Sequence, residues 1–305
     1  MAQSRRFSLK LAVIVLLAAG IVTDKLSATA HETELSTRTL RSMARAYMAF
    51  GKYDKAHILA SQALQQARSG KTDAGELALC LIDMGTVCSY EGLLNEARQR
   101  FEEGAELQKQ ALFESHPYVA HTLRMLSAVC RRQGDLEQAQ SCLSQAIEIM
   151  LRHCGLQDRE MAPFILESAN LQFAQGQMEQ AEGNYRSALD MYEQYYGSEH
   201  LMTADVLEQM SKFWLACNNF TQAQETMSQS LAIKSRIFGR YHPMLIDGWL
   251  TMARLSRMQG QMERCEYYLA KTEEAAALTR NAVTLAQVYE QINRIRKADL
   301  VAAAF

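Results

Sequence analysis

The chain repeats one pattern at a nearly fixed interval, and this interval constrains its fold more than any other feature. Equivalent positions recur at intervals of about 42 residues, a period typical of repeat architectures. The positions are Gly51, Gly92, Gly134, Gly176, Asn218 and Gly260, and only the first interval is shorter than the others, by a single residue. Self-similarity at such a period predicts a chain of stacked structural repeats rather than one globular core.

Three columns of small residues share this period. The first column is Ala44, Gly85, Ser127, Ala169, Ser211 and Ala253. The second is Ala56, Ala97, Ala139, Ala181, Ala223 and Cys265, and the third is Ala63, Gly104, Ala146, Ala188, Ser230 and Thr272. Helices approach closely only where side chains are small, and a large residue forced into such a contact costs about 1–3 kcal/mol. We therefore expect helix A of each repeat to pack on its helix B, and helix B to pack on the next repeat.

This register of small and large residues resembles the tetratricopeptide repeat, whose usual unit has 34 residues. The longer spacing is similar to the variety found in kinesin light chains, over roughly residues 36 to 275. The loops between repeats share that likeness through Gly155, Gly197, Gly239, His116-Pro117 and His242-Pro243. The resemblance implies an all-α, right-handed α-solenoid of about six helix-turn-helix repeats that binds a partner protein. Phe113 and Asn218 depart from it, because the pattern has glycine at both positions.

The two ends of the chain differ from the repeats. We expect the solenoid to occupy residues 31–279 and a C-terminal capping helix to occupy residues 280–305. The segment from Ala282 to Val301 is amphipathic, and a solenoid needs such a cap to cover its last apolar face. Its basic residues are expected on the solvent side, and its apolar face is expected to hold Val283, Ala286, Tyr289 or Ile292, and Ile295 or Ala298.

Residues 1–30 have the pattern of a secretory signal peptide. Arg5, Arg6 and Lys10 precede an apolar run of twelve residues, Leu11 to Val22, and the segment ends in Ala28-Thr29-Ala30. A helix that spans a bilayer needs about 20 apolar residues. We therefore expect export, to a bacterial periplasm or outside the cell, with cleavage after Ala30. The alternative is a membrane anchor formed by residues 9–22.

The charge balance excludes one class of partner. The whole chain has 32 basic and 34 acidic side chains. Removal of residues 1–30 leaves 28 basic against 33 acidic side chains, a net charge of −5. Nucleic-acid binding requires a basic footprint. We therefore expect a protein or peptide partner and no nucleic acid, with membrane contact only through an uncleaved N-terminal segment.

Known catalytic and metal-binding motifs are missing from the sequence. It contains no G-x-S-x-G, H-E-x-x-H or paired-carboxylate motif, so we expect no enzymatic activity, no cofactor and no metal. His116, His200 and His242 recur at multiples of the repeat period, which indicates a feature of the loop rather than a set of ligands.

Seven cysteines allow two interpretations. Cys88 and Cys130 lie at the same helix A position of successive repeats, so a disulfide between them is one reading in an oxidising compartment. Buried free thiols are the other, since free cysteine packs as a small apolar residue. The odd number argues against a full disulfide framework.

The candidate binding site follows from the way such repeats stack, because helices A line the concave face of the solenoid. In the family's register, its exposed positions lie three residues before and one, four and five residues after the first small column. We call these positions the helix-A face. The residues expected to form a peptide-binding groove are Arg41, Arg45, Tyr90, Arg124, Arg131, Asn170, Phe173, Lys212, Arg254 and Arg257.

This composition favours an acidic peptide. Arginine takes a carboxylate through two parallel hydrogen bonds, the resemblance implies that Asn170 holds a peptide backbone, and Tyr90 and Phe173 offer apolar pockets. The alternative is that these cations are solvated or paired with acids on neighbouring helices. A rival function is a structural solenoid that assembles with itself in an exported complex.

Overall fold

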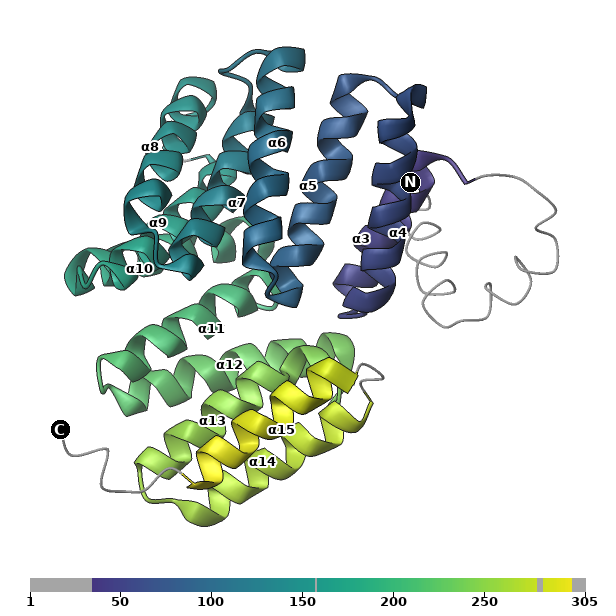
Figure 1. The fold of residues 1–305 in the computed structure, drawn as a ribbon. Helices are drawn as coiled ribbons and strands as arrows, with labels where there is room; N and C mark the ends of the chain where they lie inside the picture. Colours follow the sequence, from purple (N-terminus) through teal and green to yellow (C-terminus); the bar gives the residue numbers. More distant parts are fainter. Residues whose placement is uncertain (1–34, 157, 279–281, 298–305) are drawn as a thin grey trace, which may run out of the picture. The chain divides into compact units, whose positions relative to one another are not determined.

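The computed structural model consists of helices, and helices that follow one another within each of two compact parts pack as antiparallel pairs, as expected (Figure 1). It describes residues 35–156, 158–278 and 282–297. These residues form 13 α-helices and no strand. The chain divides between Asp135 and Leu136 into two compact parts, which we call the N-terminal and the C-terminal part.

The N-terminal part holds the first two repeats and helix A of the third. Its helices are α3 (Thr37–Ala49), α4 (Tyr53–Gln66), α5 (Ala74–Glu91), α6 (Leu94–Leu112) and α7 (Pro117–Gln133). A short π-helical turn, Ala67–Lys71, follows α4. Each helix contacts the next along the chain from α3 to α7, so the five helices form one continuous layered stack.

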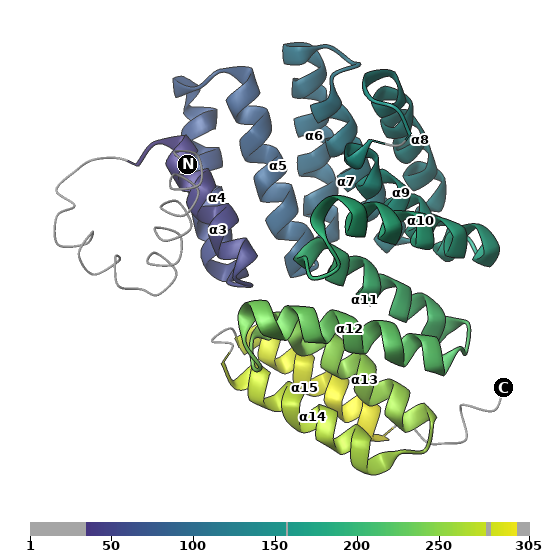
Figure 2. The ribbon, with the colours of Figure 1, turned by 180° about the vertical axis from the view of Figure 1, so that it is seen from behind.

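The C-terminal part continues with helix B of the third repeat. Its helices are α8 (Leu136–His153), α9 (Ala162–Ala174), α10 (Met178–Tyr196), α11 (Leu201–Ala216), α12 (Phe220–Phe238), α13 (Ile246–Met258), α14 (Met262–Ala277) and α15 (Ala282–Lys297). Two 3-10 turns, Arg159–Met161 and Pro243–Leu245, precede α9 and α13. Figure 2 shows the same pairs from behind.

The small columns lie where the helices meet. Ala44, Ala56 and Ala63 are fully buried, as are their alanine equivalents in the later repeats. A Cβ atom added to Gly85 would lie 2.9 Å from the Phe101 ring, so α5 and α6 are too close there for any larger residue. Helices α11 and α12 also lie close together at Ser211, whose hydroxyl donates to the carbonyl of Ala223 at 2.6 Å.

Two non-glycine residues adopt backbone conformations typical of glycine. Asn218, at the turn from α11 to α12, has φ 58°, which asparagine tolerates better than most residues. Phe113, after α6, has φ 90° and ψ 153°. This region is nearly exclusive to glycine, and any other residue there costs about 1–3 kcal/mol. The departure at Phe113 is therefore a site of backbone strain.

Helix α15 caps the sixth repeat. It contacts α13 and α14, and its Val288, Ile292 and Ile295 are buried in one cluster with Leu269 and Cys265. The expectation for Ala286 was wrong, because it is exposed. Of the alternatives Tyr289 and Ile292, Ile292 is buried and Tyr289 is exposed, and Leu285 is partly buried against the same cluster. The charged residues face solvent as expected: Arg294, Arg296 and Lys297 are exposed.

Several expectations fall on residues that the structure leaves undescribed. The signal segment 1–30, the side chain of Val283 and residue Ala298 lie outside the described residues. Among the described helices, none is long and apolar enough to cross a membrane.

Candidate partner-binding site

Arg41 belongs to the helical interface rather than to the exposed face. Its Nε donates to Asp83 Oδ2 at 2.7 Å, and its Nη1 donates to Glu76 Oε1 at 2.9 Å. The residue is only 6% exposed. Burial lowers the pKa of Arg41, but the carboxylates of Asp83 and Glu76 outweigh burial, and the pKa lies above its ordinary value. The expectation of an exposed groove arginine was wrong here, because α5 supplies two acids to it.

Arg45 and Tyr90 remain accessible on the helix-A face of the N-terminal part. Arg45 Nε donates to Asp83 Oδ1 at 2.7 Å, and 54% of its side chain is exposed. Tyr90 is 61% exposed, and its ring stacks on Tyr53 at 5.2 Å with an angle of 7° between the planes. The stacking holds the Tyr90 ring in a fixed orientation, which reduces the entropy lost when a ligand packs on it.

Three arginines of α7 extend this face. Arg124 and Arg131 are half-buried and Arg132 is exposed. Nη1 of Arg132 donates to the carbonyl and the hydroxyl of Ser89, both at 2.8 Å. No carboxylate among the described residues pairs with Arg132. Partial burial, then the charge of Arg131, lowers the pKa of Arg132. An anion beside Arg132 would therefore be stabilised by charge that the protein leaves uncompensated.

In the C-terminal part, Asn170 is committed to an internal network. It is 9% exposed, its Oδ1 accepts from the hydroxyl of Tyr185 at 2.7 Å, and its Nδ2 donates to Glu167 Oε2 at 3.3 Å. The expectation that Asn170 presents its amide to a peptide was wrong, because Tyr185 and Glu167 already use both ends of the amide. Phe173 is half-buried and packs edge-on against Phe213 at 5.6 Å.

Two of the remaining candidate cations of the C-terminal part, Lys212 and Arg254, have hydrogen-bond partners within it. Lys212 Nζ donates to Glu208 Oε1 at 2.8 Å, and Arg254 Nη2 donates to Gln291 Oε1 of α15 at 2.9 Å. Lys212 and Arg254 are exposed, and Arg257 is half-buried. The alternative of cations paired with acids on neighbouring helices thus holds for Arg41 and Arg45, which pair with acids of α5, whereas Lys212 pairs within its own helix. Arg132 in the N-terminal part and Arg254 in the C-terminal part have no carboxylate partner among the described residues.

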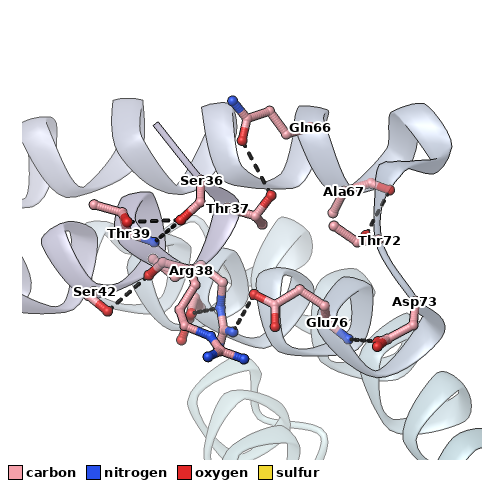
Figure 3. Close-up of polar contacts among 12 residues, drawn as sticks. Ser36, Thr37, Arg38, Thr39, Ser42, Gln66, Ala67, Thr72, Asp73 and Glu76 are labelled. Carbon is pink, nitrogen blue, oxygen red and sulfur yellow. Dashed lines mark hydrogen bonds and ion pairs between the residues drawn. The ribbon is translucent and has the colours of Figure 1, made fainter. Parts of the chain in front are cut away.

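The sequence reading overlooked Asp83 and Glu76. A signal was available, since Asp83 follows Arg41 by 42 residues, one more than the interval between these two repeats, and adjacent repeats bring such positions near one another. A hollow of about 460 Å³ in this region is lined by Leu35, Ser36, Thr37, Arg38, Gln66, Thr72, Asp73 and Glu76. Figure 3 shows two of its polar contacts: the Thr37 hydroxyl donates to the Gln66 side chain, and the Asp73 carboxylate accepts from the backbone N–H of Glu76. The hollow therefore lies at helix ends.

The recurring histidines cap helices, which confirms their structural interpretation. Nδ1 of His116 accepts from the backbone N–H of Tyr118 at 3.2 Å, and His200 and His242 make the same contact with Met202 and Met244. Such caps satisfy amide groups that have no partner in the first helical turn.

The cysteines are free thiols in this structure. Cys80, Cys88, Cys130, Cys142 and Cys265 are buried, which agrees with their reading as small core residues, and no disulfide joins Cys88 to Cys130. One ligand atom each from Cys154, Asp158 and Glu160 lies within 4.8 Å of the other two. Asp158 there caps the N–H of Glu160 at 2.8 Å, which accounts for its position.

The chain consists of repeated helical pairs, and the candidate binding residues lie on helix A of each pair. These features define a helical-repeat protein. The sequence profile of the tetratricopeptide repeat matches residues 35–110 and 78–152, and the same period continues beyond them. Residues 35–152 are therefore similar to tetratricopeptide repeats, and the described helices have the fold of a tetratricopeptide-repeat solenoid.

Solved structures of the same fold agree. BtubC (BKLC) from P. vanneervenii is 18% identical with a TM-score of 0.55, over 74% of this chain and 91% of that one. Apo RapI is 15% identical with a TM-score of 0.62, over 88% and 94% of the two chains. NprR with its cognate peptide NprX is 14% identical with a TM-score of 0.64, over 99% and 88%. No curated protein matches the sequence.

Proposed function

We propose that this chain is a protein-interaction scaffold that binds an acidic segment of a partner protein on the helix-A face of its N-terminal part. The observation that carries the proposal is Arg132, a cation without a carboxylate partner among the described residues. It is held in place by Ser89 and lies beside Arg131 in the sequence. Arg45 and the stacked ring of Tyr90 belong to the same face.

The expected interaction energies are compatible with a modest binding affinity for an acidic peptide. An exposed ion pair contributes about 0.2–1 kcal/mol. Several such pairs, with an aromatic anchor on Tyr90, approach the roughly −8 kcal/mol of a micromolar complex. NprR was solved with its cognate peptide, so the fold is able to hold a peptide. This role uses charge and shape only, and it requires no catalytic group.

Charge reversal tests the site. The probe is a fluorescein-labelled peptide of six glutamates with one central tryptophan, read by fluorescence anisotropy against its glutamine counterpart. We expect R131E/R132E to weaken binding of the glutamate peptide at least tenfold. The matched control is R152E/R186E, because both arginines are exposed on helices B and pair only within their own helix. Equal affinity in the two double variants would refute the site, provided circular dichroism shows both folded.

Self-assembly is the rival function, and the C-terminal cap bears on it. Helix α15 covers the sixth repeat and carries Glu290, Asn293, Arg294 and Lys297 on an exposed hollow. A charged surface of this kind disfavours end-to-end stacking through α15. Sedimentation velocity at rising protein concentration tests this rival directly, because a stacking solenoid would show a growing sedimentation coefficient.

We also propose that the protein is exported and acts outside the cytoplasm. The basic start, the apolar run and the Ala28-Thr29-Ala30 end support this proposal. N-terminal sequencing of protein recovered from its own host tests it: His31 as first residue would agree, and an intact N-terminus in a membrane fraction would favour the anchor instead.

A further inference from the structure

The loop between α6 and α7 places an aromatic residue where equivalent loops have glycine. Gly197 after α10 has φ 90° and ψ 157°, and Gly239 after α12 has φ 92° and ψ 162°. Phe113 has almost the same angles, φ 90° and ψ 153°. The loop shape thus calls for glycine, and Phe113 adopts it under strain. Strain of this kind gathers at functional positions.

Little of the Phe113 side chain is buried, so its packing offsets little of this strain. It is 68% exposed, and its ring meets the His116 ring edge-on at 5.7 Å. The His116 ring lies 4.9 Å from the ring of Tyr118, which is 57% exposed. Two accessible aromatic rings therefore flank a histidine that is fixed by its role as a helix cap. Aromatic residues that are exposed and held in place are typical anchors of protein interfaces.

Charge indicates what this surface accepts. Glu114, next to Phe113, is exposed and has no ion pair among the described residues. An aromatic face attracts a cation, and a carboxylate takes a guanidinium through two hydrogen bonds. Arginine combines both properties, because its planar head stacks on rings and donates in the plane.

We propose that residues 113–118, the aromatic loop, form a second docking surface that binds an arginine-containing segment of a partner protein. This surface lies on a loop between repeats, whereas the helix-A face prefers acids, so the two surfaces select partner segments of opposite charge. The proposal stands independently of the function assigned to the helix-A face.

The test uses the purified protein and fluorescein-labelled Gly-Ser-Arg-Leu-Arg-Ser-Gly, with a second peptide in which both arginines are glutamine. We expect the arginine peptide to bind, the glutamine peptide to bind at least fivefold more weakly, and F113G and E114Q each to weaken the arginine peptide at least threefold. F113G should also raise the melting temperature by several degrees, because it removes the strain. Thus the loss of binding will not reflect unfolding.

The matched control is Y241S, which removes a 43% exposed aromatic ring from the equivalent loop after α12. It should leave the affinity unchanged. The proposal is overturned if F113G keeps wild-type affinity, or if both peptides bind alike. It is also overturned if F113G abolishes a concentration-dependent dimer while the peptide does not bind, since the occupant would then be a second copy of this chain.

Discussion

Lys234 of α12 places its Nζ 2.6 Å from Oε2 of Glu208 on α11; within the fifth repeat Lys234 is buried and Glu208 is half-buried, with 13% of its side chain exposed. Nζ also lies 2.8 Å from Asp205, and Lys212 donates to the other oxygen of Glu208. Burial alone raises the pKa of Glu208, but the charges of Lys234 and Lys212 outweigh it and lower the pKa to about 2. Lys212, which the sequence placed in a groove, therefore helps to hold this network.

Acid should weaken the fold through Glu208. An unfolded chain has a glutamate pKa near 4.3, so it takes up the proton before the folded chain does as pH falls. The stabilisation is fully present above about pH 4.5 and is lost as pH falls toward 2. At pH 7, we expect Glu208→Gln to cost about 3–5 kcal/mol, because it leaves Lys234 without its closest partner. Urea unfolding at pH 7, 5 and 3 measures this, and the loss between pH 5 and 3 should be smaller in the variant. If the wild type and the variant lost the same stability between pH 5 and 3, the assignment of this pH dependence to Glu208 would be contradicted.

Replacing Arg41 should affect stability and not recognition. Arg41→Met leaves Asp83, which is 4% exposed, with Arg45 as its cationic partner, and removes the partner of Glu76. Breaking a buried ion pair costs about 3–5 kcal/mol. The urea midpoint should fall, while the folded variant should bind the glutamate peptide within twofold of wild type. If the variant bound the glutamate peptide tenfold more weakly while its urea midpoint stayed unchanged, Arg41 would have to be assigned to the binding face.

Because the His200 side chain caps α11, substitutions at this position should change the stability in a graded order. His200→Ala removes the acceptor for the Met202 amide and should cost about 0.5–2 kcal/mol. His200→Asp restores an acceptor and adds a negative charge at the start of α11, which the helix dipole favours. Thermal unfolding of both variants at pH 7 should therefore rank alanine below wild type, with aspartate equal or higher. A neutral alanine variant would show that the contact contributes nothing.

Thiol labelling should separate the seven cysteines by burial. Burial raises the pKa of the Cys80 thiol to about 12 and that of Cys88 to about 11, so both stay protonated and shielded at pH 8. Cys217 is exposed. We expect Ellman's reagent at pH 8 to modify Cys217 fastest in the native protein, with Cys80 and Cys88 reacting only after unfolding. Cys217→Ser serves as the control, and it should remove the fast phase; a fast phase that persists would point to another accessible thiol.

The periodic residues predicted the fold well, because helix packing depends on steric size at regular spacing. The small columns place Ala44, Ala56 and Ala63 at fully buried contacts, and the turn positions adopt the positive φ that glycine favours. The capping helix was also predicted, although Leu285 and Val288, and not Ala286, lie on its packed face, since an amphipathic pattern leaves the rotation of a helix undecided by about one position.

The site was predicted less well, because the exposure of a side chain depends on which residues of other helices pack around it. A helical register assigns Arg41 and Asn170 to a face, but Asp83, Glu76 and Tyr185 turn both residues inward. The same holds for Phe113, whose substitution for glycine is visible in the sequence while its strain and exposure are not. Local spacing thus suffices to specify helices and their pairing. The ion pairs and hydrogen bonds that leave Arg132 uncompensated and bury Arg41 arise only when segments far apart in the chain pack together.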